Sequence, residues 1–305
     1  WSDQSLAITL EAGVGLGANP IATFGTEAQK QRWLPDLCAG RALGGFGLTE
    51  PDAGSDAGAT RTTATLDEAA DEWVIDGEKA FITNSGTSIT SIVTITARTG
   101  ADEISTIVVP SGTPGFEVQP AYRKMGWHAS DTHGLAFTGC RVPADNLLGT
   151  RGRGFAQLLA ILDDGRVAIA AMAVGVIKRC LDDSLAYAQE RNAFGRAIGT
   201  YQAVAFQIAD LQVALEASQA LVYRAAWLRD QGQPFKREAA VAKLYATEAA
   251  VSATRTATQV FGGAGFMDDT AVARHYRDSK VLEIGEGTSE IQRLVISREL
   301  GLAPQ

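Results

Sequence analysis

The sequence contains few of the residues that build disulfide frameworks and metal sites. Only three cysteines and three histidines occur among its 305 residues. Cys38, Cys140 and Cys180 lie far apart and form no Cys-x-x-Cys pair, so their spacing predicts neither a disulfide framework nor a zinc site. We therefore expect reduced thiols and a reducing compartment, either the cytoplasm or, in a eukaryote, the mitochondrial matrix.

A long apolar run and an excess of basic charge are also missing. The longest apolar stretch, residues 167–177, is well short of the roughly 20 residues that a membrane span needs, and it predicts a buried helix. The formal net charge is −8 and the pI is about 5.0, with no run of basic residues that could neutralise a phosphate backbone. The sequence therefore predicts neither a membrane span nor a nucleic-acid partner.

The chain is long enough for about two domains of roughly 150 residues each, and its hydrophobic content of 46% is enough for a sizeable core. It begins at Trp1, without an initiator methionine and without the charged, apolar and small-residue order of a signal peptide. We therefore expect the natural N-terminus to lie upstream of this residue.

Helical and β patterns follow one another along the chain. Thr26 and Glu27 give a start signal, and Gly40 a stop signal, for a helix over about 27–39, which Asn19-Pro20 is expected to separate from an earlier helix. From about Leu43 the pattern changes to short β-rich runs between glycines. These runs predict a β domain of about a hundred residues.

The strongest hairpin signal is Asp76-Gly77, because Asp-Gly supplies the positive φ angles of a type I′ turn. It lies between β-rich runs at 73–75 and 80–83, so we expect two strands joined there by a turn. Further strands are predicted at 91–97, 105–109, 116–118 and 135–142.

After residue 154 the period becomes helical. Val204, Ile208, Leu211 and Leu215 recur at spacings of four, three and four, which places an apolar stripe on one helix face. Long helices are predicted at about 156–190, 202–231 and 236–260, with shorter ones up to 299, as in an up-and-down bundle. The fold class predicted from these patterns is α+β.

Glycines cluster at 47–56, 259–266 and 285–288, together with hydroxyl, acidic or amide residues. No Gly-x-Gly-x-x-Gly opens a helix after a strand and no P-loop motif occurs, so neither nucleotide-binding motif is favoured. Bare backbone can approach a planar or phosphorylated ligand closely, and Thr49, Ser55 and Thr288 could hydrogen-bond it. Taken singly, the clusters are explained as well by strand bends and helix ends.

Taken together, the clusters resemble the acyl-CoA dehydrogenase family. Residues 47–56 resemble one signature of this flavin-dependent family, and residues 259–278 resemble the second. Further matching segments, in the family's order, are 76–84, 124–127, 141–143, 190–195 and 286–293. The resemblance covers nearly the whole chain.

The resemblance implies an architecture and an assembly. We expect the end of an N-terminal helical domain at 1–42, a middle β-barrel-like domain at 43–150 and a C-terminal four-helix bundle at 151–305. FAD would lie between the β domain and the bundle, and the protein would be a homotetramer or homodimer. The family usually has several more helices before the segment that begins here at Trp1, and those helices help to close its site.

For Glu286, the local sequence and the family resemblance predict different functions. A helix is predicted to start near Thr288, where Ser289 and Gln292 have capping-box spacing, so the position alone favours an acid attracted by the helix dipole. The resemblance instead aligns Glu286 with the carboxylate that removes the α-proton of the substrate. Because that proton is weakly acidic, the base needs a desolvated pocket and a nearby sink for the developing charge.

The resemblance also implies residues that face the substrate. Some relatives carry their base on a bundle helix directly before an arginine, and the corresponding residue before Arg166 is Gly165, which cannot act. Asp163 and Arg166 are expected to face the coenzyme A moiety and the active site, unless Arg166 is a surface charge paired with a neighbouring aspartate. Ser55 and Ser130 are expected near the thioester and pantetheine, unless both are simple turn residues.

Two glycines predict a wide acyl pocket. Many relatives have a tyrosine directly before the catalytic glutamate, where this chain has Gly285, and Gly165 adds no bulk either. A missing ring leaves space, so we expect branched or cyclic acyl groups to be tolerated. The prediction fails if Gly285 only serves loop geometry or if Phe81 or Leu162 refills the space.

For the flavin, the resemblance places Phe46, Leu48 and Thr49 along the ring edge and Phe81 and Thr83 near its reactive nitrogen. Phe81 could instead be a plain core aromatic, but Thr83 lies two residues on, on the same side of the strand. A further set is expected to reach the FAD of a neighbouring subunit or to complete that end of the site: Arg191, Phe194, Gln202, Gln259, Gly262, Gly263, Thr288 and Glu290. Ser55 is expected to contact the cofactor as well as the substrate. Arg191 would give charge-assisted bonds to phosphate, unless it is a solvated cation at a helix end.

The activity implied by the resemblance is oxidation of an acyl-CoA thioester to trans-2-enoyl-CoA, with an electron-transfer flavoprotein as the electron acceptor. Glu286 would take the α-proton and FAD would accept the β-hydrogen as hydride. The alternatives are an acyl-CoA oxidase that uses oxygen and a flavin-free scaffold of the same fold. No metal is expected, since His128, His133 and His275 show no ligand spacing.

Overall fold

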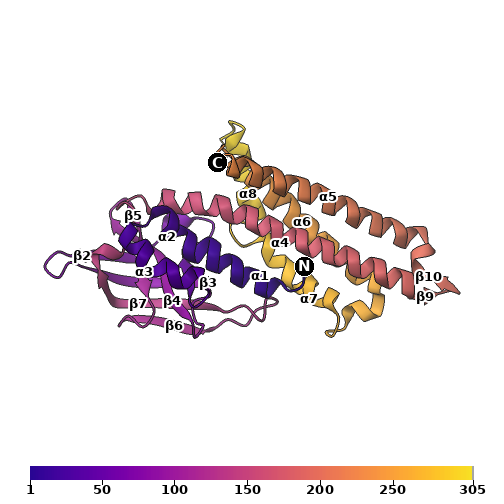
Figure 1. Cartoon of the computed structure of the whole chain (residues 1–305), viewed down its shortest axis with the longest axis horizontal. Coiled ribbons are helices and arrows are strands. Elements are labelled where there is room, and N and C mark those ends of the chain that lie inside the picture. The colour runs from indigo at the N-terminus through magenta and orange to yellow at the C-terminus, as the bar shows by residue number, and fades with distance from the viewer. Residues whose placement is uncertain (304–305) are drawn as a thin grey trace. The chain divides into compact units, whose positions relative to one another are not determined.

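The computed structural model describes residues 1–303, which form two compact units (Figure 1). The β unit comprises Leu6–Lys124 and His128–Leu162. The helical unit comprises Trp1–Ser5, Met125–Trp127 and the chain from Asp163 onward. Helix α4 (Gly154–Glu190) contributes to both, because the division falls within it.

Short helices precede the sheet: α1 (Gln4–Glu11), the π-helix η1 (Ala12–Ala18), α2 (Asn19–Phe24) and α3 (Glu27–Cys38). The predicted start of α3 is confirmed, because Thr26 and Gln29 form a capping box with N···O distances of 3.2 and 2.9 Å. The predicted break at Asn19-Pro20 is wrong. Pro20 lies in the first turn of α2, where its missing N–H has no intrahelical role, and the chain leaves the helix at Gly25 instead.

An eight-stranded sheet forms the centre of the β unit, in the order β6-β7-β3-β2-β4-β5-β8 with β1 parallel to β4. The strands are β1 (Leu43–Gly47), β2 (Thr63–Asp67), β3 (Glu72–Thr83), β4 (Thr90–Gly100), β5 (Glu103–Pro110), β6 (Phe116–Ala121), β7 (Thr132–Pro143) and β8 (Leu147–Leu148). Short 3₁₀ turns lie at η2 (Ala57–Ala59) and η3 (Ala144–Asn146).

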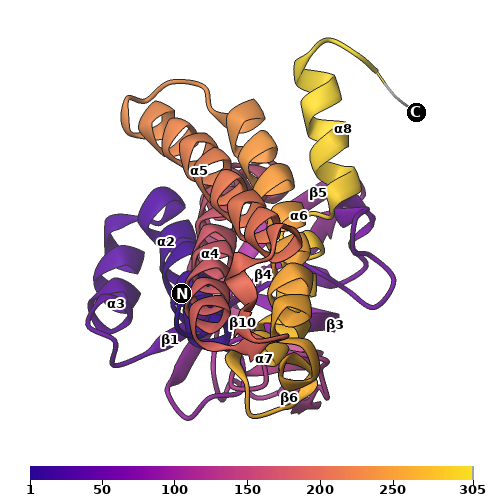
Figure 2. The same ribbon diagram turned by 90° about the vertical axis from the view of Figure 1, so that its right-hand side faces the viewer.

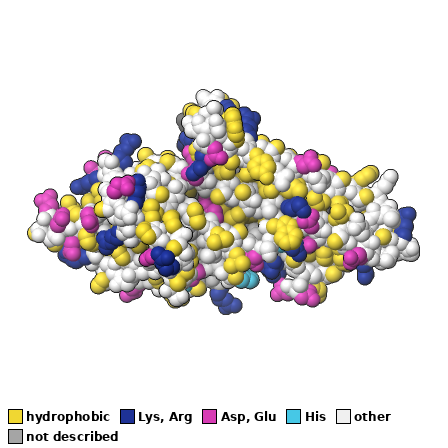
Figure 3. Space-filling view, in the orientation of Figure 1, with side chains coloured by type: hydrophobic (Ala, Val, Ile, Leu, Met, Phe, Trp, Pro, Cys, Tyr) yellow, Lys and Arg dark blue, Asp and Glu magenta, His cyan; other side chains and the backbone are white. Residues whose placement is uncertain are grey.

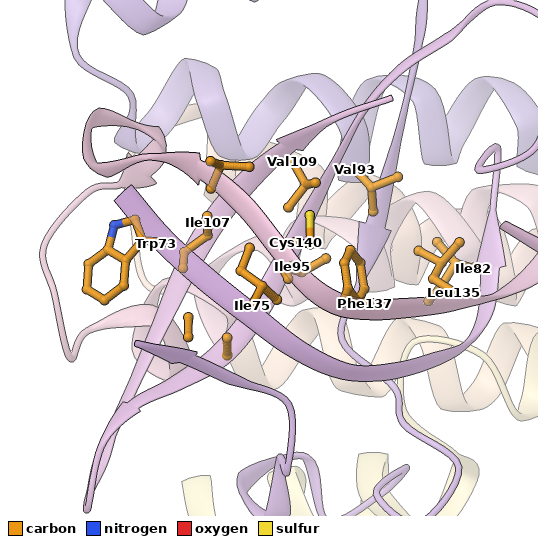
Figure 4. Packing of buried hydrophobic residues seen from close by; sticks show 13 residues of the cluster. Trp73, Ile75, Ile82, Val93, Ile95, Ile107, Val109, Leu135, Phe137 and Cys140 are labelled. Carbon is orange, nitrogen blue, oxygen red and sulfur yellow. The ribbon is translucent and has the colours of Figure 1, made fainter. Parts of the chain in front are cut away.

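The hydrophobic core of this unit lies against the sheet. Ile75, Ile95 and Phe137 are buried in it together with Cys140 (Figure 4). Burial raises the pKa of the Cys140 thiol to about 11, so this cysteine is a small apolar core residue at neutral pH. The four strands predicted between residues 91 and 142 are confirmed as β4, β5, β6 and β7.

The predicted hairpin at Asp76-Gly77 is wrong. Strand β3 runs through these residues without turning, and its register against β7 shifts between Ile75 and Gly77. Gly77 has a φ of 143°, and a Cβ atom there would lie 2.6 Å from Thr62 Cα. The Asp-Gly pair therefore forms a bulge in a long strand, where the close approach of Thr62, directly before β2, requires a glycine.

The helical unit contains α4, α5 (Gln202–Asp230), α6 (Lys236–Phe261), α7 (Ala271–Ser279) and α8 (Ser289–Glu299). The short pair β9 (Asn192–Ala193) and β10 (Arg196–Ala197) and the 3₁₀ segments η4 (Ile198–Thr200), η5 (Gly262–Phe266) and η6 (Lys280–Glu283) connect them. The three long helices are confirmed, with their ends within two residues of the predicted positions.

The long helices alternate in direction (Figure 1), and α5 and α6 lie side by side (Figure 2). The predicted stripe on α5 turns inward, since Leu211 and Leu215 are buried and Val204 and Ile208 are half-buried. Facing helix α6 buries many alanines, and such small side chains allow close helix packing. Within residues 1–303, no helix is both long and apolar enough to cross a membrane.

Candidate active site

Glu286 lies in a strained loop of the helical unit, between η6 and α8. Glu286 and Gly287 both have left-handed backbone, with φ angles of 52° and 92°. For a residue with a side chain, this conformation costs of the order of 1–3 kcal/mol, so surrounding contacts must hold it. Thr288 caps α8 by accepting a hydrogen bond from Ile291 N at 3.3 Å, so the capping residue is Thr288 and not Ser289 as predicted.

Two buried side chains hold this loop through its carbonyl groups. Gln292 Nε2 donates to the carbonyl oxygens of Gly287 at 2.8 Å and of Glu286 at 3.3 Å. Lys243 Nζ, from α6, donates to the same Gly287 oxygen at 2.8 Å. A Cβ atom on Gly287 would lie 2.8 Å from Gln292 Nε2, which leaves no room for a larger residue. The loop is therefore fixed by groups from two helices.

The Glu286 side chain turns toward Gly165 on α4, and its carboxylate oxygens are buried. A Cβ atom at Gly165 would lie 1.8 Å from Glu286 Oε2. The space beside Gly165 is thus filled by the carboxylate, and the expectation that this glycine widens the pocket is wrong. Gly285 differs, because a Cβ atom there would meet only Val281 O, at the ordinary contact distance of 3.5 Å.

Buried charges surround this carboxylate. Arg166 is only 3% exposed and pairs with Asp163, so its interpretation as a surface charge is wrong. Burial lowers the pKa of Arg166, against the opposing charges of Asp163 and Glu286, and burial raises the pKa of Asp163. Burial also lowers the pKa of Lys243 to about 8, although the charge of Glu286 opposes this shift. Glu286 therefore has two buried cations as electrostatic neighbours, Arg166 and Lys243.

The candidate flavin residues of the β unit lie at the end of β1 and the end of β3. Phe46 belongs to β1, and Leu48 and Thr49 follow it; all three are half-buried. Phe81 is 66% exposed, with its ring centroid 5.2 Å from that of Tyr122, so the core-aromatic interpretation is wrong. Its φ of 63° marks a second strained residue. A large exposed aromatic ring in a strained backbone is typical of a ligand surface.

A buried ion pair connects these two segments. Lys79 Nζ on β3 lies 2.7 Å from Glu50 Oε1, and the two side chains are 0% and 5% exposed. Lys79 also donates to Leu48 O and to Thr96 Oγ1, both at 3.3 Å. Burial lowers the pKa of Lys79 to about 8, against the opposing effect of Glu50. Burial alone would raise the pKa of Glu50, but the hydrogen bond and charge of Lys79, with the Arg61 N–H, bring it below its usual value.

Ser130 lies at a pocket of about 700 Å³ within the β unit, which is lined by residues 121–124 and 128–132. Its hydroxyl is buried and has no hydrogen-bond partner among the described residues. Because buried hydroxyls are nearly always paired, this one is suited to a polar group of a ligand. Lys124 Nζ fixes the wall of the pocket through Thr132 Oγ1 at 2.7 Å. Ser55 is exposed and is not among the lining residues.

The residues predicted to reach a neighbouring subunit's cofactor gather at one end of the helical unit. Tyr187 on α4 stacks on Phe261 of α6 with ring centroids 4.1 Å apart, which brings the ends of the two helices together. Arg191, Gln202 and Gln259 lie exposed near these ends, and so do Gly262 and Gly263, whose Cβ positions are open. Phe194, on the turn after β9, is 97% exposed. Thr288 and Glu290 lie elsewhere, at the start of α8 beside Glu286.

Models of three acyl-CoA dehydrogenase domains match the chain in order: the N-terminal domain over 1–41, the middle domain over 45–140 and the C-terminal domain over 152–301. Probable acyl-CoA dehydrogenase YngJ of Bacillus subtilis is 49% identical over 97% of this chain and 78% of its own length. The chain belongs to the acyl-CoA dehydrogenase family. Its family membership confirms the identification made from the signature segments, while the boundaries at 42 and 150 stay a prediction.

Solved structures of similar proteins share the fold of this acyl-CoA dehydrogenase family member. Butyryl-CoA dehydrogenase from Megasphaera elsdenii has a TM-score of 0.95 at 42% identity, over 98% of this chain and 79% of that chain. A chain from a structure of the electron transferring flavoprotein of Acidaminococcus fermentans also has a TM-score of 0.95, at 41% identity, over 98% of this chain and 78% of that chain. An acyl-CoA dehydrogenase complexed with FAD from Bacillus anthracis has a TM-score of 0.93 at 32% identity, over 97% of this chain and 54% of that chain. The α+β class is thereby confirmed.

Sequence reasoning missed buried charged residues of this family member, among them Glu50, Lys79 and Lys243. Glu50 and Lys79 lie within segments that carry the resemblance, and Lys243 lies outside them. Charged side chains are usually exposed, so the amino-acid type gave no sign of burial. Lys79 follows Glu78 in a strand, and Lys243 lies one residue from Leu244 on a mostly apolar helix. The available signal for the burial of Lys243 was its position among alanines on the inner face of a predicted helix.

Proposed function

We propose that the chain is an acyl-CoA dehydrogenase of fatty acid metabolism that oxidises a short-chain acyl-CoA thioester to trans-2-enoyl-CoA, with Glu286 as the base. The observation that carries the proposal is the Glu286 carboxylate, which is buried against Gly165 with Arg166 and Lys243 as cationic neighbours. The similarity to butyryl-CoA dehydrogenase supports a short acyl chain. Neither an oxidase nor a flavin-free scaffold is favoured by these relatives.

Each group around Glu286 has a function in taking the α-proton. The carboxylate accepts the proton, and the cationic neighbours favour its charged form before the reaction. Burial excludes water, so these charges act more strongly than they would at the surface. The left-handed loop and Gly165 fix the direction of the carboxylate, which lowers the entropic cost of reaching the reactive geometry.

FAD is the cofactor we propose, and the residues present fit it. The exposed Phe81 ring, with Thr83, Leu48 and Thr49, would hold the isoalloxazine ring, and Phe46 would lie at its edge. When bound, FAD supplies the hydride acceptor that no amino-acid side chain can provide. Ser55 and the orphaned Ser130 hydroxyl would contact the substrate side, with Asp163, Arg166 and Gly285 in the helical unit.

A homotetramer or homodimer is supported by apolar side chains on the outside of α5. Phe206, Val213, Tyr223 and Trp227 are each more than half exposed. Hydrophobic side chains are visible on the surface of the helical unit (Figure 3), and exposed apolar patches mark interaction sites.

We propose an electron-transfer flavoprotein as the electron acceptor, supported by the similarity to the Acidaminococcus fermentans chain. Free Cys38, Cys140 and Cys180 support a reducing compartment, the cytoplasm or the mitochondrial matrix.

The proposed activity is tested by the flavin itself. The purified protein should absorb as a flavoprotein, and butyryl-CoA should bleach this absorbance under anaerobic conditions. Colour that returns slowly in air but rapidly with an electron-transfer flavoprotein supports a dehydrogenase. Rapid return in air indicates an oxidase, and a colourless protein that takes up no FAD contradicts the proposal.

Arg191→Ala tests the proposal that two chains build each flavin site. We expect the variant to lose most of its FAD while its thermal unfolding midpoint changes little, because a charge-assisted bond to phosphate is removed from an exposed position. Arg237→Ala is the control, since Arg237 is an exposed arginine paired with Glu238. A monomeric protein that holds one FAD per chain would contradict the prediction.

Gly285→Tyr tests the width of the acyl pocket. The backbone has room for a side chain at this position, and the aromatic ring should fill space that a branched acyl group would use. Each buried methylene is worth about 0.8 kcal/mol, so the ratio of kcat/KM for branched over straight acyl-CoA should fall several-fold. An unchanged ratio would show that Gly285 serves only the loop backbone.

A further inference from the structure

Lys243 is a buried charge to which the reaction described above gives no direct step. It extends from α6, its side chain is fully buried, and Nζ donates to Gly287 O at 2.8 Å. The charged groups that act on it come from every neighbouring element: Arg166 on α4, Glu283 on η6, Glu286 in the loop and Glu290 on α8. Glu286 has the largest effect among them.

A hydrogen bond to the loop does not by itself explain a lysine. Gln292 already donates to the same Gly287 oxygen at the same distance of 2.8 Å, without a net charge. Burying an ammonium group is costly, and here it lowers the pKa of Lys243 to about 8. The charge must therefore be offset by a nearby carboxylate, and Glu286 is the first candidate.

Arg166 does not make Lys243 redundant. Arg166 forms an ion pair with Asp163, so much of its field is cancelled by that neighbouring carboxylate. Glu283 is similarly occupied by Lys280, and Glu290 is exposed, where solvent screens its charge. Of these two buried cations, Lys243 is thus the one whose charge is less compensated by another ion pair.

We propose that Lys243 is a positioning residue for Glu286: it fixes the left-handed Glu286–Gly287 loop and its charge sets the pH range in which the Glu286 carboxylate can accept a proton. This inference rests on the proposed function. A cation beside a carboxylate favours the ionised form, so removing it must move protonation of Glu286 to higher pH. Without the cation, Glu286 would be protonated, and so unable to act as the base, at the acid end of the pH–activity profile. Activity at alkaline pH would persist.

The catalytic test compares Lys243→Met with the FAD-loaded wild type, using butyryl-CoA. We expect the acid limb of kcat/KM against pH to move up by about one pH unit, so activity falls about ten-fold at acid pH and much less at pH 9. Lys243→Arg keeps the charge and should keep the wild-type limb. Lys178→Met is the control, because Lys178 is an exposed lysine on α4 whose ion pair is with Asp182. A limb that stays in place in Lys243→Met, together with an unmoved ionisation step of Glu286 in the unfolding measurement below, overturns the proposal.

A second measurement does not depend on catalysis. The difference in unfolding free energy between wild type and Glu286→Gln, measured against pH, reports the ionisation of Glu286 in the folded protein. This difference in free energy changes with pH where Glu286 titrates. When both proteins also carry Lys243→Met, we expect that change to occur at higher pH. If the step moves but the kinetic limb does not, Glu286 is not the base, and the proposed function fails while the coupling to Lys243 holds.

Folding failure also decides the question. Lys243→Gln keeps a donor without a charge and is the second neutral variant. If Lys243→Met and Lys243→Gln both fail to fold while Lys243→Arg folds, Lys243 is required for the fold rather than for the pH response of Glu286, and the proposal is wrong.

Discussion

Glu286→Gln should lower turnover with acyl-CoA by about a hundred-fold to ten-thousand-fold, the usual contribution of a general base. Glutamine is nearly the same size, so it can occupy the space against Gly165, but it is far less basic. The fold and the flavin content should therefore remain. Steady-state turnover and flavin absorbance together measure the two expectations.

The control for this variant is Glu216→Gln, which changes an exposed glutamate on α5 in the same way and should keep full activity. If Glu286→Gln turns over within a few-fold of the wild type, the base lies elsewhere. Bleaching of the flavin by substrate separates a loss of proton abstraction from a loss of later electron transfer, because only the former prevents bleaching.

Lys79→Met should reduce the free energy of unfolding by about 3–5 kcal/mol, because it leaves the Glu50 carboxylate buried without its cation. Chemical denaturation followed by circular dichroism measures this loss. Replacing both partners, in Lys79→Met with Glu50→Gln, should restore part of the stability, since a buried charge is then no longer left alone.

Asp52→Asn is the matched control, since Asp52 is two residues from Glu50 but belongs to an exposed pair with Arg61. Its effect should stay below about 1 kcal/mol. The pKa of folded Glu50 lies below its ordinary value, so its contribution is complete above the pH where an unfolded glutamate titrates and is lost as the pH falls. Equal losses in Lys79→Met and Asp52→Asn would show that burial of the pair has no energetic consequence.

Local sequence signals predicted the parts of the fold that depend on local contacts. Helices α4, α5 and α6 have long periodic patterns, and their ends were found within two residues. Asp76-Gly77 wrongly predicted a turn, because the same dipeptide occurs both in turns and in β-bulges. What decides between them is the pairing of β3 with β7 and the closeness of Thr62, and both are long-range contacts.

In the candidate active site, too, local sequence predicted one part and long-range contacts determine the rest. Glu286 could be identified from the segment around it, because the order of residues carries the resemblance. Its surroundings could not, since Gly165, Arg166 and Lys243 reach it from two other helices. The spacing of residues along a chain contains no information about which helix faces meet, and the burial of a lysine runs against its usual preference.

The contact between Gly165 and Glu286 makes the two positions epistatic. A Cβ atom at 165 would overlap Glu286 Oε2, so any side chain added there must displace the carboxylate while a glutamate occupies 286. The same mutation becomes acceptable once the residue at 286 has been shortened. Either change made alone therefore gives a protein in which the carboxylate is missing or displaced, so we expect the two positions to change together during divergence.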